Sequence, residues 1–176
     1  MLKKLGKNIG TLIIIVVLIT MGILSASAAP EKIIIGTSAD WPPFEWIDAN
    51  NNFVGFDMDL MKIIAKIQGY EIEIQDIGFD SLIPALQSDR IDLMAAGATL
   101  TEERLEVADA SNTYWSGSQG VMVTEESELN IATALTEGKS VGAQRGTTQA
   151  DWLEENLVGA GVNITLELYE TNDLGI

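Results

Sequence analysis

The chain has 176 residues, of which 26 are acidic and 10 are basic, so its formal net charge is −16 at pH 7. It contains no cysteine and no histidine. Disulfides, thiolate or Ser-His-Asp catalysis, and metal sites built from Cys or His are therefore excluded. The acidic balance also argues against nucleic acid as a partner, and we expect no metal and no cofactor.

Residues 1–28 have the three parts of a secretory signal peptide. Three lysines precede the apolar run TLIIIVVLITMGIL, and the small residues ASA follow it at 26–28. We expect cleavage after Ala28. An uncleaved membrane anchor is the alternative, because the apolar run is nearly as long as a short membrane span. The rest of the chain has seven basic and 26 acidic residues, a net charge of −19, and we expect it in the periplasm or outside the cell.

After the signal, short apolar runs alternate with amphipathic stretches, which predicts an α/β fold. KIIIGT (32–37) is short and β-branched and is predicted as a buried strand. WPPFEW (41–46) is predicted to be irregular, because its two prolines remove two hydrogen-bond donors. DANNNFVG (48–55) is rich in Asn and Asp and is predicted as a turn between two short strands.

FDMDLMKIIAKIQG (56–69) is predicted as a helix, with Asp57 capping its start and Gly69 its end. The i, i+3, i+4, i+7 spacing predicts one apolar face on this helix. That face consists of Leu60, Ile63, Ile64 and Ile67.

YEIEIQDI (70–77) alternates and is predicted as the second strand, and IDLMAAG (91–97) is predicted as the third. Between them, FDSLIPALQSDR (79–90) is predicted as a helix. Asp80 would be its N-cap, which leaves Pro84 in the first turn, where proline is tolerated. A β-α-β-α-β series of this kind forms a parallel sheet with right-handed crossovers.

A lobe boundary is predicted near Thr124, which separates lobe 1 (29–123) from lobe 2 (124–176). SGSQGVMVTEES (116–127) is predicted as a strand followed by a polar turn, with 119–124 as the hinge. A lobe of about fifty residues is small for a core of its own, and we expect the chain to be the N-terminal part of a longer protein. The elements predicted beyond the boundary are a strand SVGAQ (140–144), a helix TTQADWLEENL (147–157), a strand NITLELYE (163–170) and a helix start TNDLGI (171–176).

Arg104, one of only three arginines, stands in AGATLTEERLEV (96–107). Thr101 is a natural N-cap and places Arg104 in the first turn of a helix, where the dipole disfavours a cation unless an anion is held there. Its neighbours at i+3 and i+4 are not acidic, so no local ion pair accounts for it. Gly97 and Thr99 precede it at the carboxyl end of the third strand, where open α/β sheets bind ligands. Arg104 is a candidate to grip a planar carboxylate; a solvated surface arginine is the alternative.

QRGTTQAD (144–151) passes from a strand into a helix. The backbone N–H groups of Thr147 and Thr148 open that helix, and a helix start of this type binds carboxylate or phosphate. Plain capping by either threonine is the alternative. There is no GxxxxGK[ST] motif, so a phosphate-binding P-loop is not supported.

Three aromatic residues, Trp41, Phe44 and Phe79, follow the first two strands, at the same sheet edge as Gly97 and Thr99. Two flat rings there could hold the aliphatic part of a small ligand, whereas core packing is the alternative for each ring alone. Together the three segments predict a ligand with a carboxylate and a short side chain, held between two lobes.

Four stretches between Ile35 and Leu153 match a known family in order and spacing. They are IGTSADWPPFEW, FVGFDMDLMKIIAK, FDSLIPALQSDRIDLMAAGATLTEER and VGAQRGTTQADWL. In these stretches the chain resembles the extracellular solute-binding proteins of polar amino-acid ABC importers, which have a type II periplasmic-binding-protein fold. The resemblance implies two lobes with mainly parallel sheets flanked by helices and closure by hinge bending. It also implies a monomer without catalytic residues, an amino-acid ligand and a membrane permease as partner.

The resemblance implies roles for the lobe 1 candidates. Trp41 and Phe79 match the aromatic residues that sandwich the ligand side chain. Gly97 matches a carbonyl contact to the α-ammonium group, and Thr99 matches a contact through its hydroxyl and N–H.

Arg104 matches the arginine that binds the α-carboxylate. Thr148, with Thr147 beside it, matches an N–H contact from the second lobe to the same carboxylate. Gln144 occupies a position that touches the ligand side chain in some relatives. Ser38 departs from the pattern, because members that bind cationic or amide side chains often carry an acid there. This departure argues against a lysine or arginine ligand.

Two other functions on this fold stay open from the sequence. A dehydratase acting on a cyclic carboxylate would need a general acid over the ligand, for which Asp40 and Glu45 are the local candidates. The other is the ligand-sensing domain of a membrane receptor. The family's acidic partner for the α-ammonium group lies beyond Ile176, as does the segment that completes the first lobe.

Overall fold

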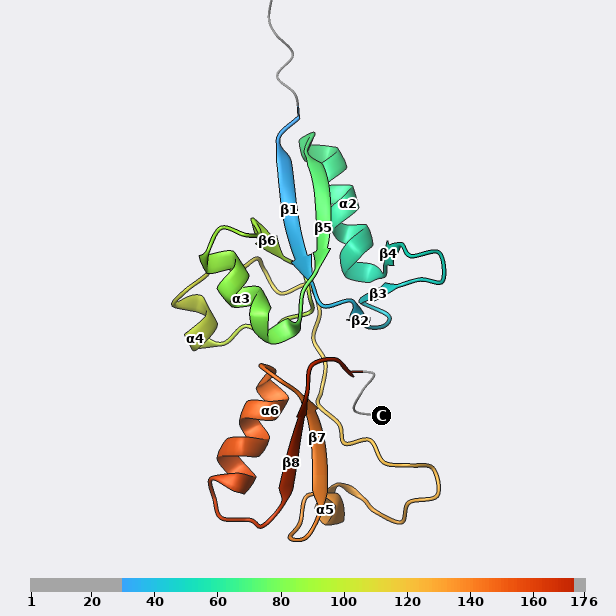
Figure 1. The fold of residues 1–176 in the computed structure, drawn as a ribbon, viewed down its shortest axis with the longest axis vertical. Helices are drawn as coiled ribbons and strands as arrows, with labels where there is room; N and C mark the ends of the chain where they lie inside the picture. Colours follow the sequence, from blue (N-terminus) through green and yellow to red (C-terminus); the bar gives the residue numbers. More distant parts are fainter. Residues whose placement is uncertain (1–29, 173–176) are drawn as a thin grey trace, which may run out of the picture. The chain divides into compact units, whose positions relative to one another are not determined.

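The computed structural model describes residues 30–172, so the predicted signal peptide and the end of TNDLGI lie outside the described residues. Within 30–172, no helix has the length and apolar character that crossing a membrane requires. A parallel sheet has β1 (Lys32–Thr37) in its centre, between β5 (Glu71–Asp76) and β6 (Leu93–Met94), as Figure 1 shows. The predicted parallel sheet is confirmed, although its third strand covers only two residues of 91–97.

Two helices cover opposite faces of this sheet. Successive strand residues point to alternate faces, so each helix packs on a different set of strand side chains. Helix α2 (Phe56–Gln68) packs on one face and α3 (Phe79–Gln87) on the other (Figure 1). The core under α3 contains Ile34, Ile77, Leu82, Ala85 and Ile91. The core under α2 contains Ile33, Ile35, Met58, Ile72 and Ile74.

The apolar face that the spacing predicted for α2 is not the one that packs on the sheet. Ile63, Ile64 and Ile67 are 56%, 43% and 74% exposed. Met58 is fully buried instead, and Met61 packs beside it. Apolar residues occupy two overlapping stripes of α2, and one residue position corresponds to about 100° of rotation. Spacing alone could not decide which stripe faces the sheet.

The predicted helix caps are partly wrong. Gly55 and Gly78 occupy the N-cap positions of α2 and α3, and neither Asp57 nor Asp80 caps its helix. Both aspartates lie in the first turn, where the helix dipole favours a negative charge. Because α3 begins at Phe79, Pro84 falls inside the helix and not in its first turn. Gly69 ends α2 with a left-handed φ of 77°, as predicted.

A small antiparallel sheet follows β1, with the strand order β2-β3-β4. The strands are β2 (Asp40–Trp41), β3 (Glu45–Ile47) and β4 (Phe53–Val54). The segment 41–46 is therefore irregular only at its prolines and Phe44, because the residues on either side pair with each other. The predicted turn between two short strands is confirmed between β3 and β4.

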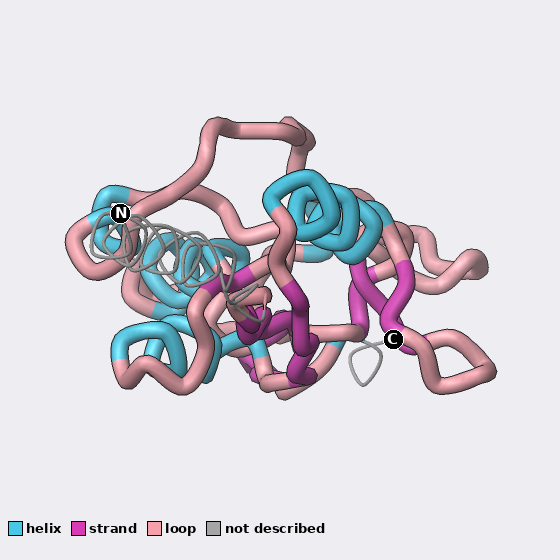
Figure 2. Tube along the Cα trace, turned by 90° about the horizontal axis from the view of Figure 1, so that it is seen from above, coloured by secondary structure: helices cyan, strands magenta, loops and turns pink. Residues whose placement is uncertain are grey.

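A second parallel sheet joins β7 (Ser140–Gln144) and β8 (Thr165–Tyr169). The segment 116–124 was predicted to begin as a strand, but it lies in a long loop. None of the described strands pairs with it, and an unpaired segment leaves its backbone groups to water. Loops make up much of the chain, as the pink segments of Figure 2 show. The remaining helices are α4 (Glu102–Leu105), α5 (Ile131–Ala134), α6 (Thr148–Leu153) and the π-helical η1 (Glu154–Val158).

Candidate functional site

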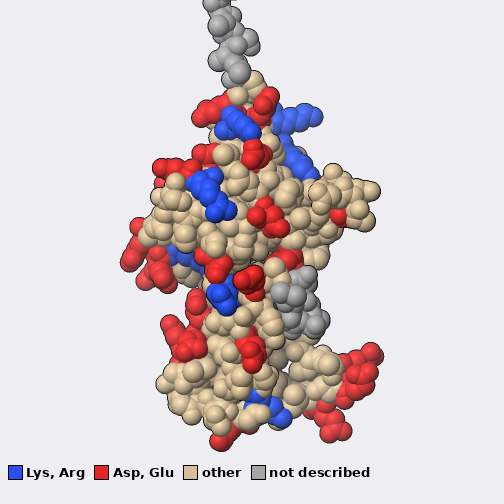
Figure 3. Space-filling view, viewed as in Figure 1, with Lys and Arg blue, Asp and Glu red and all other residues tan. Residues whose placement is uncertain are grey.

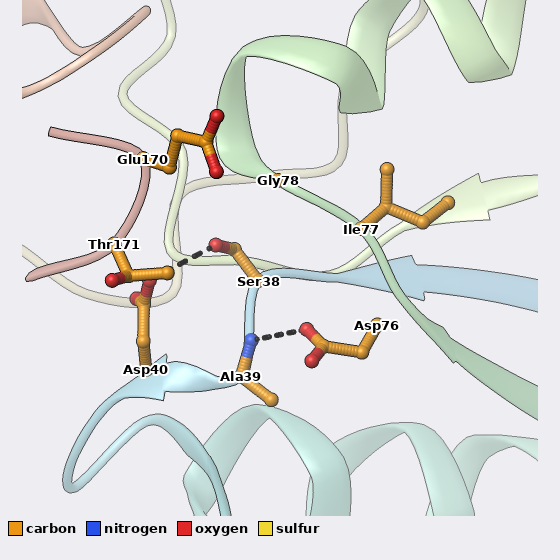
Figure 4. Close-up of a pocket in the computed structure, with 8 residues that line it drawn as sticks. All are labelled: Ser38, Ala39, Asp40, Asp76, Ile77, Gly78, Glu170 and Thr171. Atoms are coloured by element: carbon orange, nitrogen blue, oxygen red, sulfur yellow. Dashed lines mark hydrogen bonds between the residues drawn. The ribbon is translucent and has the colours of Figure 1, made fainter.

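A cavity of about 330 Å³ lies where three strands end. Figure 4 shows residues that follow β1, β5 and β8 converging on it. Carboxyl ends of parallel strands meet at one sheet edge, which is where α/β proteins bind ligands. The lining residues are Ser38, Ala39, Asp40, Asp76, Ile77, Gly78, Glu170 and Thr171.

Three carboxyl-bearing residues line this cavity, namely Asp40, Asp76 and Glu170. Asp40 Oδ2 accepts hydrogen bonds from Gln144 Nε2 at 3.0 Å and from the Asn172 backbone N–H at 3.2 Å. Asp76 Oδ1 accepts from the Ala39 N–H at 3.0 Å. The segments 38–40 and 170–172 are thus joined through side chains as well as through the cavity wall.

Two predicted site residues belong to this group. Ser38 is buried, with its hydroxyl 3.4 Å from Asp40 Oδ2. Gln144, at the end of β7, reaches Ser38, Asp40 and the carbonyl of Glu170. Sequence reasoning did not include Asp76 and Glu170 in the site. Asp76 is the last residue of β5, and Glu170 directly follows β8. Their positions at the carboxyl ends of predicted strands could have identified them from the sequence.

Arg104 lies in the first turn of α4, as predicted, and Thr101 Oγ1 accepts its backbone N–H at 3.2 Å. Its guanidinium donates to the carbonyls of Thr99 at 2.8 Å and Gly146 at 2.9 Å. The guanidinium carbon also lies 5.5 Å from the centre of the Phe79 ring, within the range of a cation–π contact. Arg104 therefore brings together the loop before α4, the first residue of α3 and the loop before α6.

No carboxylate forms an ion pair with Arg104 within the described part of the chain. Burial lowers the pKa of Arg104, while the charges of Asp151 and Glu103 oppose this effect. An arginine stays protonated under such conditions. Arg104 lines a second cavity of about 440 Å³, with Gly146 and Asp151 among the other lining residues. The guanidinium has five N–H groups, so donors remain for a further acceptor.

The predicted helix start after β7 is present. Thr147 is the N-cap of α6, where its Oγ1 accepts from the Ala150 N–H at 3.3 Å and donates to the Gln144 carbonyl at 2.7 Å. The capping alternative thus describes the Thr147 side chain. Thr148 is the first residue of α6, and its hydroxyl lies 3.3 Å from Gln149 Oε1.

The aromatic residues have different neighbours. Trp41 stacks on Phe44 with ring centres 4.7 Å apart, and its ring also lies against Gly97, where a Cβ atom would overlap it. Gly97 has a φ of 52°, in the left-handed region that favours glycine. Phe79 lies instead under Arg104. The sandwich of a ligand between Trp41 and Phe79 stays a prediction.

The visible face of the protein is rich in acidic side chains (Figure 3). Figure 3 shows acidic side chains spread over the visible face, with few basic ones among them. An acidic surface raises the local concentration of cations and repels anions.

Comparison with known proteins then decides the family. Residues 33–167 match the family described as bacterial extracellular solute-binding proteins, family 3. The chain belongs to this family. The resemblance stated from the sequence is therefore confirmed over most of the described residues.

Relatives of this solute-binding protein are named as binding proteins. The arginine-binding extracellular protein ArtP of Bacillus subtilis (strain 168) is 41% identical over 126 residues, which are 72% of this chain and 49% of the relative. The ABC transporter arginine-binding protein 1 of Escherichia coli (strain K12) is 36% identical, over 73% of this chain and 52% of the relative. The chain spans about half the length of the curated relatives it matches.

Solved structures confirm the two-lobed fold class. Holo ArgBP from T. maritima has a TM-score of 0.71 and 35% identity, over 82% of this chain and 62% of that chain. The ancestral amino acid-binding protein AncCDT-1, described as a precursor of cyclohexadienyl dehydratase, has a TM-score of 0.75 and 30% identity. The match covers 82% of this chain and 63% of the ancestral protein's chain.

Proposed function

We propose that this protein binds an amino acid with a cationic side chain outside the cell and delivers it to the permease of an ABC importer. It acts as a monomeric binding protein, with no catalytic residue and no cofactor. Lobe 1 (29–123) and lobe 2 (124–176) close on the ligand by bending in the loop 119–124. The names of the relatives, which bind arginine or histidine, support this ligand class.

The observation that carries the proposal is the state of Arg104. A half-buried cation that forms no ion pair with any described carboxylate, in a chain of net charge −16, is available to an anion. The α-carboxylate of an amino acid fits, because guanidinium and carboxylate pair through two parallel hydrogen bonds. The N–H groups at the start of α6 would add to this contact, since Thr148 lies two residues after Gly146, whose carbonyl accepts a hydrogen bond from Arg104.

The ligand side chain would enter the cavity between β1, β5 and β8. The carboxyl-bearing residues of this cavity, Asp40, Asp76 and Glu170, favour a positively charged side chain. They supply the negative charge that is missing at Ser38, whose presence on its own argued against a lysine or arginine ligand. The carboxylate and the side chain of one ligand could reach both places, since Gly78 lines this cavity and the next residue, Phe79, lies under Arg104.

The test is calorimetric titration of the mature protein with L-arginine, L-lysine and L-citrulline. Citrulline has the shape of arginine but a neutral ureido group. We expect binding of arginine or lysine and at least tenfold weaker binding of citrulline, because the carboxylates lose their charged partner. Equal affinity for citrulline would contradict the cationic ligand class.

The same titration is repeated on two variants. Arg104→Ala should abolish binding, because losing a buried, charge-assisted pair costs on the order of 2–5 kcal/mol. Arg90→Ala, at an exposed arginine, is the matched control. Unchanged affinity in Arg104→Ala would remove Arg104 from the site. If no amino acid binds but a cyclic carboxylate is bound and converted, the dehydratase function replaces this proposal.

A further inference from the structure

Two buried carboxyl groups lie outside both cavities. Glu45 in β3 and Asp57 in the first turn of α2 are each only 1% exposed. One oxygen of each group, Glu45 Oε2 and Asp57 Oδ1, is buried and has no hydrogen-bond partner among the described residues. Two ionised carboxylates that each leave one buried oxygen without a donor would be costly at such a place. A proton on one carboxyl group supplies the missing donor.

Asp57 is connected to a predicted ligand contact. Its Oδ2 accepts the backbone N–H of Gly97 at 2.9 Å, although Gly97 is 40 residues away in the sequence. The same oxygen accepts the hydroxyl of Tyr114 at 2.8 Å. The Trp41 ring lies against the Cα of Gly97. The Gly97 peptide is therefore held through its N–H by Asp57 and at its Cα by Trp41.

A first-turn aspartate commonly does no more than favour the helix dipole. That role needs neither burial nor a distant partner, and Asp59, in the same turn, performs it while exposed. Asp57 differs because its carboxylate is buried and its hydrogen bonds leave the helix. The arrangement is specific to the Gly97 loop.

We propose that Asp57 is a positioning residue that fixes the Gly97 peptide for ligand contact, and that a proton on Glu45 keeps the Asp57 carboxylate in place. This inference rests on the function proposed above and on the contact between the Gly97 carbonyl and the ligand's α-ammonium group that the family resemblance implies. The N–H group that donates to Asp57 and the carbonyl group that would contact the ligand both belong to Gly97, whose φ lies in the left-handed region. Loss of the Asp57 side chain would therefore change the orientation of the Gly97 carbonyl group.

The charges around Glu45 agree with this arrangement. The titratable groups that face it are Asp57 on α2, Asp40 on β2 and Tyr114 on the loop after α4. Burial, followed by the charges of Asp57 and Asp40, raises the pKa of Glu45 to about 9. Burial and the hydrogen bond to Asp57 also raise the pKa of Tyr114. Glu45 thus holds its proton at pH 7 and loses it only under alkaline conditions.

The first test needs no ligand. Hydrogen exchange of the Gly97 amide is measured by NMR in the full chain, in Asp57→Ala and in the control Asp59→Ala. We expect exchange at least about tenfold faster in Asp57→Ala than in the control, because the amide loses its acceptor. Equal protection of Gly97 in the two variants would overturn the proposal, whether or not an amino acid binds.

The second test measures the affinity for L-arginine at pH 7 and pH 9.5 in the wild type and in Glu45→Gln, which keeps a donor towards Asp57 but cannot ionise. The ligand's own ammonium group titrates in this range, so only the difference between the two proteins counts. We expect the alkaline loss of affinity to be several-fold larger in the wild type. Equal losses would overturn the role of the proton. If the wild type binds no arginine at pH 7, the proposed ligand is wrong. The hydrogen exchange of the Gly97 amide then still tests the role of Asp57. The same Glu45→Gln comparison, made on Gly97 exchange at the two pH values, then decides the role of the proton.

Discussion

Glu45 illustrates how one side chain can make stability depend on pH. Its pKa is about 9 in the folded protein, against 4.5 for the ordinary group. Between these values the folded chain holds a proton that the unfolded chain has released. The free energy of unfolding therefore decreases as pH rises through this window, by up to about 1.4 kcal/mol per pH unit.

We predict that Glu45→Gln removes most of this slope. The amide keeps the size and the donor of the protonated acid, but it does not ionise. At pH 8 the variant should be more stable than the wild type by on the order of 2–4 kcal/mol. Urea unfolding at pH 5, 7 and 9 measures this, with Glu125→Gln, at an exposed glutamate, as the control. Parallel pH profiles for the wild type and Glu45→Gln would show that Glu45 is ionised in the fold.

At the scale of single residues, the sequence predicted positions better than contacts. Arg104 was placed in the first turn of a helix capped by Thr101, and the structure has it there. The reason is local, because a cap needs only the residues of one turn. The role of Asp57 could not be predicted, since its partners Gly97 and Tyr114 are 40 and 57 residues away. The sequence offered it as a helix cap, which is the local interpretation.

Among the elements, α2 allows a direct test of which face packs on the sheet. We predict that Met58→Ala lowers the free energy of unfolding by about 2–5 kcal/mol, because it leaves a cavity in a closed core. Ile67→Ala, at a site that is 74% exposed, should cost less than about 1 kcal/mol. Chemical unfolding of the two variants makes the comparison. A larger decrease in the free energy of unfolding for Ile67→Ala than for Met58→Ala would mean that the face predicted from the spacing packs on the sheet.

The elements that sequence could predict are those with a strong period or a clear cap. The strand β1 was predicted with the bounds it has, and β5 and β7 were also found. The strand predicted within 116–127 is absent because a strand depends on a partner that local sequence does not reveal. The short strand β2 was missed for the opposite reason, since its pairing with β3 overcomes the prolines between them. Strand pairing depends on two segments, so it cannot be predicted from either segment alone.

For the whole molecule, the excess of acidic residues should affect ligand capture. We predict that the affinity for L-arginine falls by a factor of a few between about 20 and 300 mM salt, because added ions screen the attraction of a cation. The affinity for L-citrulline, which has no net charge, should change less. Titrations of both ligands across this salt range supply the measurement. An equal salt dependence for the two ligands would mean that the surface charge serves solubility alone.

The cavity at Asp40 also has a consequence for how the protein acquires its activity. Asp40 contacts Gln144 and Asn172, which are 104 and 132 residues further along the chain. Closing loops of that length is entropically costly, and contacts between distant segments form slowly. We therefore expect the walls of the cavity to come together late in folding, after each sheet has formed from its own nearby strands. If an amino acid binds there, as proposed, we expect it to recognise only the folded protein, and so to stabilise the chain only at the end of folding.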